Sequence, residues 1–107
     1  MNIGQYDIVL VNLDPTIGSE IRKTRPCVVL SPDEMNRHLR TVVIAPITST
    51  DKDYPTRVRV EQAKITGRIA IDQIRTIDRQ RVVRSLGTLK AATIARCEQV
   101  LQETFVD

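Results

Sequence analysis

Short runs of β-branched residues, separated by polar loops, constrain the fold of this sequence more than any other feature. Val and Ile, with some Leu, make up most of the runs, and β-branched residues favour extended strands. The run from Arg25 to Leu30 becomes continuously apolar after Pro26, which predicts a central strand. Six ranges have strand character: Tyr6 to Leu13, Arg25 to Leu30, Thr41 to Ile47, Arg57 to Val60, Arg68 to Ile77, and Val82 to Leu86.

The connections between these runs carry turn and helix-start signals. Ser31 can cap a helix that begins with Pro32, and this helix has room for only a turn or two. Ala63 to Gly67 and Asp78 to Arg81 are predicted turns. Pro15 to Thr24 forms a long polar loop.

The C-terminal segment changes to a helical period. Ile94, Cys97 and Leu101 recur on one face, Thr104 or Phe105 extends that face, and Val100 lies beside it. The pattern predicts a helix from about Lys90 to Glu103. The fold expected is mainly β: a curled antiparallel sheet or small barrel with a C-terminal helix packed against it.

Length and composition predict one domain over residues 1–107, with a core that needs neither disulfides nor metal. Cys27 and Cys97 lie in apolar or helical patterns 70 residues apart in the sequence, which predicts two buried, reduced thiols. There is no metal-ligand motif, signal peptide or membrane-length apolar run. We therefore expect a soluble, cytoplasmic protein without a metal or other cofactor.

The loop from Gly18 to Pro26 carries one carboxylate, Glu20, and three cations, Arg22, Lys23 and Arg25. Such a loop requires water or an anionic partner around it. Arg25 stands immediately before Pro26 and an apolar strand, so we expect the core to hold its stem while its head faces the loop. Arginine suits phosphate because its planar fork bonds two oxygens at once.

A second polar loop opens with Thr48, Ser49 and Thr50, just after Pro46. Hydroxyl residues are common in turns, so turn chemistry alone explains them. If the strand before this loop neighbours the strand after Arg25, however, Thr48 and Arg25 converge on one cleft.

Other candidate residues carry weaker signals. Asp72 lies in an otherwise apolar run, where a carboxylate usually faces solvent or pairs with an arginine. His38 is the single histidine and has no motif around it, so the paired-histidine acid/base chemistry of some ribonucleases is excluded. No nucleophile motif or phosphate-binding glycine loop is present.

At these residues the sequence resembles the MazF/PemK family of type II toxin endoribonucleases, also called mRNA interferases. The matching motifs run in the family's order over nearly the whole chain, and their joint spacing is more specific than any one of them. They are Asp14-Pro15-Thr16-Ile17-Gly18-Ser19-Glu20, Thr24-Arg25-Pro26, Val28-Val29-Leu30-Ser31-Pro32, Pro46-Ile47-Thr48-Ser49, Asp72 to Asp78, and Leu86-Gly87-Thr88-Leu89.

The resemblance implies an SH3-like barrel of the CcdB/PemK type, a homodimer, and metal-independent cleavage of single-stranded RNA at a short recognition sequence. It also implies a MazE-like antitoxin whose C-terminal segment covers the RNA groove. By resemblance, Arg25 and Thr48 carry catalysis, and Asp72 is a base in some members. In those members a basic residue stands two positions earlier, where this chain has Ala70.

RNA is cleaved when its 2′-OH attacks the adjacent phosphorus, leaving a 2′,3′-cyclic phosphate and a 5′-OH. Arg25 and Thr48 would stabilise the charge on the phosphoryl oxygens. Arginine is a poor base at neutral pH, so Glu20, Asp72 and solvent remain alternatives for taking the proton. The residues expected to bind RNA are Arg22, Lys23, Ser49, Gln73 and Arg75, with Tyr54 contributing to base recognition.

Two other interpretations fit the same pattern. A CcdB-like toxin with this barrel would bind DNA gyrase through its C-terminal helix and cleave nothing. The presence of Arg25 and Thr48 argues against this alternative, as does the lack of Trp at the C-terminal end. A catalytically decayed copy of the toxin is the third reading, and the intact loops disfavour it.

Overall fold

The computed structural model describes residues 2–13, 24–50 and 52–106. Within these ranges the chain forms seven strands, two α-helices and two 3₁₀ turns. The strands are β1 (Asp7–Asn12), β2 (Thr24–Val29), β3 (Thr41–Thr48), β4 (Arg57–Gln62), β5 (Ile65–Ala70), β6 (Arg75–Asp78) and β7 (Val82–Thr88). The helices are α1 (Asp33–His38) and α2 (Ala91–Phe105), and the 3₁₀ turns are η1 (Ile71–Gln73) and η2 (Arg79–Arg81).

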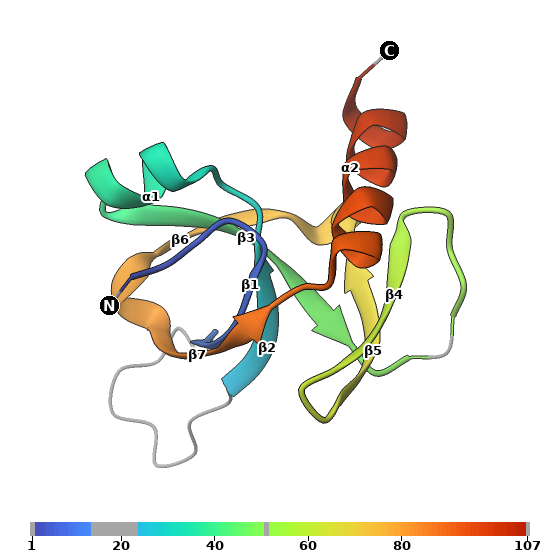
Figure 1. The fold of residues 1–107 in the computed structure, drawn as a ribbon, viewed down its shortest axis with the longest axis horizontal. Helices are drawn as coiled ribbons and strands as arrows, with labels where there is room; N and C mark the ends of the chain where they lie inside the picture. The colour runs from blue at the N-terminus through green and yellow to red at the C-terminus, as the bar shows by residue number, and fades with distance from the viewer. Residues whose placement is uncertain (1, 14–23, 51, 107) are drawn as a thin grey trace.

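The strands pair antiparallel in the order β4-β5-β3-β2-β1-β7, and β6 pairs with β3 outside this path. β3 is the branch point: Thr41–Ile44 pair with β6, whereas Ile47 and Thr48 pair with β5. The sheet curls around on itself (Figure 1). The expected mainly β class with a C-terminal helix is confirmed.

β2 is buried on both of its faces. Cys27 and Val29 pack with β1, β3, β6 and β7 in one apolar cluster, and Val28 packs in the other cluster with β4, β5 and α2. A strand between two cores must be apolar at every position, which accounts for the unbroken run after Pro26. The prediction of a central strand is confirmed, since β2 lies between β1 and β3.

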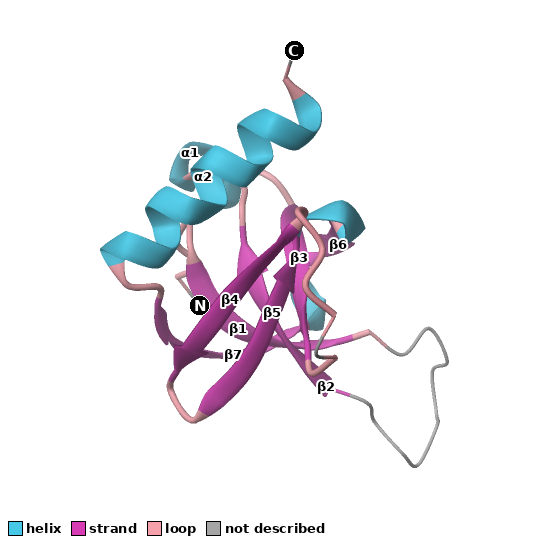
Figure 2. Ribbon diagram, turned by 90° about the vertical axis from the view of Figure 1, so that its right-hand side faces the viewer, coloured by secondary structure: helices cyan, strands magenta, loops and turns pink. Residues whose placement is uncertain are grey.

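α2 packs against β4 and η1, running alongside β4 in Figure 2, and its Cys97 and Val100 are completely buried. Its observed span confirms the predicted helix and extends it to Phe105. The prediction that Phe105 continues the buried face is wrong, because that side chain is 60% exposed. The last turn of the helix projects beyond the sheet (Figure 1), which accounts for the exposure of Phe105.

The predicted strand from Arg68 to Ile77 is wrong as a single element. η1 separates β5 from β6, burying Ile71 while Asp72 and Gln73 remain exposed. An apolar–polar alternation cannot distinguish this break from a continuous strand, because Ile71 faces the core in either case.

Two smaller predictions also need correction. The turn expected over Ala63 to Gly67 comprises only Ala63 and Lys64, which both have positive φ angles, and Gly67 belongs to β5. Ser31 does not cap α1. Its hydroxyl instead donates to Asn36 Oδ1 (2.5 Å) and accepts from the Val43 amide (3.1 Å), so it ties α1 to β3.

Candidate active site

The candidate site forms where β2 and β3 separate. Their ladder has its last pair at Cys27 and Pro46, and the same register continued by two residues would place Arg25 opposite Thr48. β3 turns away instead, and Thr48 pairs with Arg68 of β5. The separation leaves a groove of about 600 Å³ between the two strands.

The chemistry of the groove favours an anion. Its lining contains three cations and several hydroxyls, and no carboxylate is found among the described residues that line it. The lining residues are Thr24, Arg25, Pro26, Ile47, Thr48, Ser49, Thr50, Lys52, Tyr54, Arg57, Ile65, Thr66 and Gln73.

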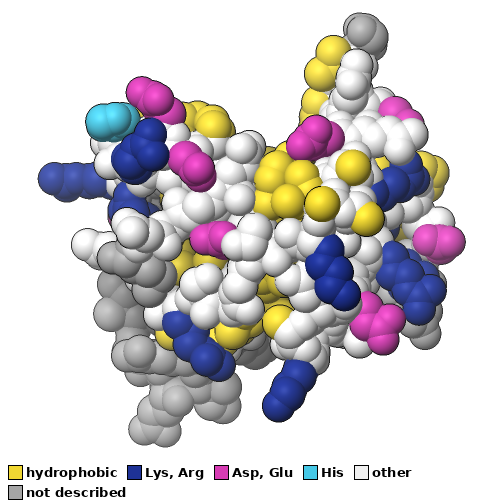
Figure 3. Space-filling model, viewed as in Figure 1, with side chains coloured by type: hydrophobic (Ala, Val, Ile, Leu, Met, Phe, Trp, Pro, Cys, Tyr) yellow, Lys and Arg dark blue, Asp and Glu magenta, His cyan; other side chains and the backbone are white. Residues whose placement is uncertain are grey.

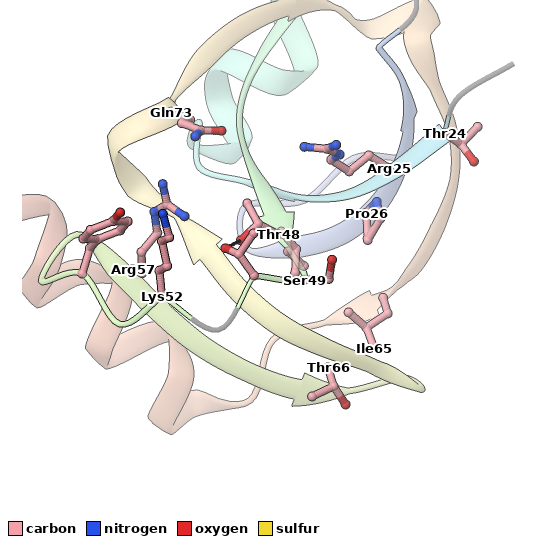
Figure 4. Close-up of a pocket in the computed structure, with 13 residues that line it drawn as sticks. Thr24, Arg25, Pro26, Thr48, Ser49, Lys52, Arg57, Ile65, Thr66 and Gln73 are labelled. Atoms are coloured by element: carbon pink, nitrogen blue, oxygen red, sulfur yellow. Dashed lines mark hydrogen bonds between the residues drawn. The ribbon is translucent and has the colours of Figure 1, made fainter.

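Arg25 reaches the groove from a well-packed strand. It pairs with Val11 of β1 and lies on the same face of β2 as Cys27 and Val29, both fully buried. The Arg25 side chain itself is exposed, and in Figure 4 Arg25 and Gln73 extend toward each other from β2 and η1. The expectation that Arg25 and Thr48 converge on one cleft is confirmed.

Thr48 is held at the end of β3 by a close approach of β5. A Cβ added to Gly67 would lie far inside van der Waals distance of the Thr48 carbonyl oxygen and 2.9 Å from Ile47 Cγ2. Glycine therefore allows the β5 backbone to reach Thr48. The Thr48 hydroxyl lies 3.2 Å from that of Thr50, so the hydroxyls at this end of the groove form a connected pair.

Asp72 holds Arg57 in place at the edge of the groove. Its carboxylate accepts from Arg57 Nε (2.7 Å) and Nη2 (3.2 Å), and from the Thr56 hydroxyl (2.9 Å). The Arg57 guanidinium also lies 5.2 Å from the centre of the Tyr54 ring, a cation–π distance. The hydrogen bonds from Arg57 are the main reason that the pKa of Asp72 is lowered.

Of the other residues predicted to form the site, one lies outside the groove lining and three lie outside the described residues. Arg75 is exposed on β6 and is absent from the groove lining, although its charge and that of Arg25 both act to lower the pKa of the Cys27 thiol. Burial outweighs them and raises that pKa to about 12. Glu20, Arg22 and Lys23 lie outside the described residues.

Three further residues of the lining, Lys52, Arg57 and Thr66, were not among the residues predicted to form the site. Arg57 was recognisable only as a cation on a strand. Its contact with Asp72 depends on the register of β4 and β5, which pairs Arg57 with Ala70 and brings Asp72 to it just beyond the ladder. The sequence feature that pointed toward this contact was Asp72 itself, since a carboxylate in an apolar run often pairs with an arginine.

Other groups of potential chemical interest lie elsewhere. His38 is the last residue of α1. Cys27 and Cys97 are buried free thiols, as predicted. In the part of the chain that is described, no three metal-ligating side chains gather, and no helix has the length and apolar character to cross a bilayer.

Comparison with known proteins identifies the family. The sequence pattern of the PemK-like, MazF-like toxins of type II toxin–antitoxin systems matches residues 4–105. The chain belongs to this toxin family. It is 32% identical to endoribonuclease MazF of Staphylococcus epidermidis over 105 residues, covering 92% of the chain and 88% of the relative.

Two further MazF proteins support the assignment. Endoribonuclease MazF9 of Mycobacterium tuberculosis is 34% identical over 107 residues, covering 90% of each chain. A crystal structure of MazE–MazF from Deinococcus radiodurans superimposes with a TM-score of 0.83 at 27% identity, covering 96% of this chain and 95% of that one. The MazF fold thus extends over nearly the whole chain.

Proposed function

We propose that this member of the MazF endoribonuclease family acts as one domain that cleaves single-stranded RNA at a short recognition sequence without a metal ion. The observation that carries the proposal is the placement of Arg25 and Thr48 in one groove, at the point where β2 and β3 separate. Cations and hydroxyls around them match the charge of a phosphodiester.

In the proposed reaction the 2′-OH of the substrate attacks the adjacent phosphorus and the bond to the 5′ oxygen breaks. The products are a 2′,3′-cyclic phosphate and a 5′-OH. The nucleophile belongs to the substrate, so the protein has to hold the backbone in line and stabilise the developing charge. Arg25 binds the phosphoryl oxygens and donates a proton to the leaving oxygen, and Thr48 bonds the same oxygens.

Asp72 has a supporting role in this proposal. A general base works best with a pKa near the operating pH, whereas the pKa of Asp72 is lowered by Arg57 and Thr56. Its carboxylate holds Arg57 at the groove edge. Glu20 and solvent are then the acceptors for the 2′-OH proton.

Base recognition would use groups at the rim of the same groove. Ser49, Gln73 and Tyr54 line it and offer a hydroxyl, an amide and an aromatic ring. Arg22, Lys23 and Arg75 would add electrostatic attraction for the rest of the strand.

We also propose partners for the groove. A cytoplasmic MazE-like antitoxin would place an acidic, extended segment over the same cations and so exclude RNA. The active form would be a homodimer. The resemblance to MazF and the antitoxin named in the Deinococcus radiodurans structure support this part of the proposal.

Incubation with a long single-stranded RNA in excess chelator tests the activity. We expect discrete fragments whose 5′-OH ends accept a labelled phosphate directly from a polynucleotide kinase. Arg25→Ala should lower the rate by about 10²–10³ or more, as removal of an oxyanion donor does. Arg84→Ala removes an exposed arginine from β7 and serves as the matched control. Uncut RNA, or equal cleavage by wild type and Arg25→Ala, would contradict the proposal.

A further inference from the structure

The outer face of β3, β5 and β4 carries a row of polar side chains that begins in the groove. Thr48 pairs with Arg68, and Arg68 pairs on its other side with Arg59. Residues directly opposite each other on antiparallel strands share a face. Ile47, Ile69 and Val58 are buried in the core cluster on the other face of the three strands, so the row points outward.

The two arginines of this row face each other across the ladder. Like charges in this position destabilise a sheet, so the fold alone gives no reason for the pair. Among the described residues Arg59 makes no ion pair, and Arg68 has one, 3.5 Å from Nε to Asp53 Oδ1. The Asp53 side chain is 86% exposed, so this ion pair contributes little.

Arg68 has a further unsatisfied group. Its Nε, the atom that lies 3.5 Å from Asp53 Oδ1, is buried and makes no hydrogen bond, so the ion pair does not satisfy this donor. A buried donor without a partner is uncommon in native proteins and requires an explanation. An anionic ligand near the Arg68 guanidinium, which would also relieve its repulsion from Arg59, supplies one.

We propose that Arg59 and Arg68 form a track for the phosphodiester backbone of single-stranded RNA, leading away from the groove at Thr48. Neighbouring strands are about 4.8 Å apart, so the row places Arg68 and then Arg59 at increasing distance from the reacting phosphate. This inference rests on the proposed function. It adds a second, sequence-independent contact region, because arginine contacts to phosphate carry no base information.

The position of the row favours RNA over an acidic protein segment. A strand whose phosphate is held at Thr48 must leave the groove on some side, and the face of β5 and β4 adjoins it directly. Lys and Arg side chains, with acidic groups among them, lie over the β4–β5 region in Figure 3. The track therefore binds the nucleotides that flank the cleavage site.

Binding of a fluorescein-labelled, mixed-sequence 2′-O-methyl RNA tests the track, because this probe lacks the 2′-OH and is not cut. Anisotropy titrations at several salt concentrations would compare wild type, Arg59→Gln, Arg68→Gln and the double variant. We expect the double variant to bind about tenfold more weakly. The slope of log affinity against log salt should fall by about 0.7 for each lost contact. Arg96→Gln, an exposed arginine on α2, is the matched control.

Arg59→Glu separates binding from folding. It places a carboxylate opposite Arg68, which stabilises the ladder, so its melting temperature should equal or exceed that of wild type. Its affinity for the probe should nevertheless be lower than that of Arg59→Gln. An Arg59→Glu variant that is less stable than wild type but binds the probe with wild-type affinity would contradict the proposed track.

Cleavage of a long transcript by the same variants distinguishes the track from the proposed function. We expect the double variant to raise KM and keep kcat. If wild type binds the probe through the row but cuts no RNA, the proposed function is wrong and the track stands. Unchanged binding and KM in the double variant would refute the track, and so would losses confined to polyglutamate binding, which indicate a protein partner.

Discussion

Asp72 binds Arg57 through both carboxylate oxygens, 2.7 Å from Nε and 3.2 Å from Nη2. The pair forms just beyond the ladder of β4 and β5, and it leaves only 9% of the Arg57 side chain exposed. A cation held in this way contributes to the groove without first losing the rotational freedom of a long side chain. Asp72 thus serves the groove through Arg57.

Asp72→Asn tests this supporting role. The amide keeps the shape of the side chain but loses the charge that holds Arg57, so we expect RNA cleavage to fall by no more than about tenfold, chiefly through KM. Loss of a general base would lower kcat by about 10²–10⁴. Steady-state kinetics of the variant distinguish the two roles, with Arg57→Lys as the companion that keeps the charge and removes the fork.

The Arg57–Asp72 pair also predicts how stability depends on pH. The pKa of Asp72 is lowered in the folded protein, so its stabilising contribution is present above the unfolded value of about 3.9 and disappears as the pH falls through the folded pKa. The carboxylate is partly exposed, which limits the effect to about 1 kcal/mol or less. Thermal melts of wild type and Asp72→Asn should differ near pH 7 and converge in acid. A constant difference down to pH 2 would rule this out.

Gly67→Ala should damage the site without touching substrate. The added methyl group would collide with the Thr48 carbonyl oxygen and with Ile47 Cγ2. Relief requires movement of β3 or β5, which overpacking places at about 1–3 kcal/mol. We expect a lower melting temperature and a lower kcat. Gly4→Ala, which meets only the Asp7 side chain, is the control. Wild-type kcat in Gly67→Ala would show that the position of Thr48 tolerates movement.

Lys64→Gly should stabilise the protein. Ala63 and Lys64 form the two-residue turn between β4 and β5, with φ angles of 54° and 62°. A left-handed conformation costs a residue with a Cβ about 1–2 kcal/mol, and glycine avoids much of this cost. The gain is partly offset by the greater freedom of glycine in the unfolded chain. Differential scanning calorimetry should show a melting temperature a few degrees higher, and Lys52→Gly, at an exposed loop position without a positive φ angle, should show no gain.

The two cysteines should resist alkylation in the folded protein. Burial raises the pKa of Cys27 to about 12 and that of Cys97 to about 11, and the thiolate is the reactive species. We expect iodoacetamide at pH 8 to label neither residue in the native state and both in denaturant, as read by mass spectrometry. Rapid native labelling of either would mean that its surroundings open readily.

The sequence was sufficient for the strands that run between two cores and for the helix with a clear apolar face. β2 and α2 have such patterns, and both were predicted closely. The break at η1 was not predictable, because Ile71 stays buried whether or not the strand continues. Spacing placed Thr104 or Phe105 on the apolar face of the helix, but spacing does not reveal where the sheet beneath a helix ends, and Phe105 is exposed.

The candidate site likewise has some features that the sequence predicted and others that it could not. Arg25 precedes one apolar run and Thr48 follows the next, so their approach could be expected once the two strands were taken as antiparallel neighbours. The Arg57–Asp72 and Arg59–Arg68 relationships depend on the register of β4 and β5. Register follows from turn geometry, and neither Ala63 nor Lys64 carries the usual signal for a turn with positive φ angles.

The pairing of β1 with β7 determines when the sheet can be completed while the chain is being synthesised. β1 can pair with β2 early, but Asp7 lies opposite Thr88, so its second neighbour, β7, becomes available only after most of the chain has been synthesised. The groove depends on β3 being held by both β2 and β5, and these contacts also span distant parts of the chain. A growing chain therefore lacks the completed groove until Gln73, the last residue of its lining, has been added.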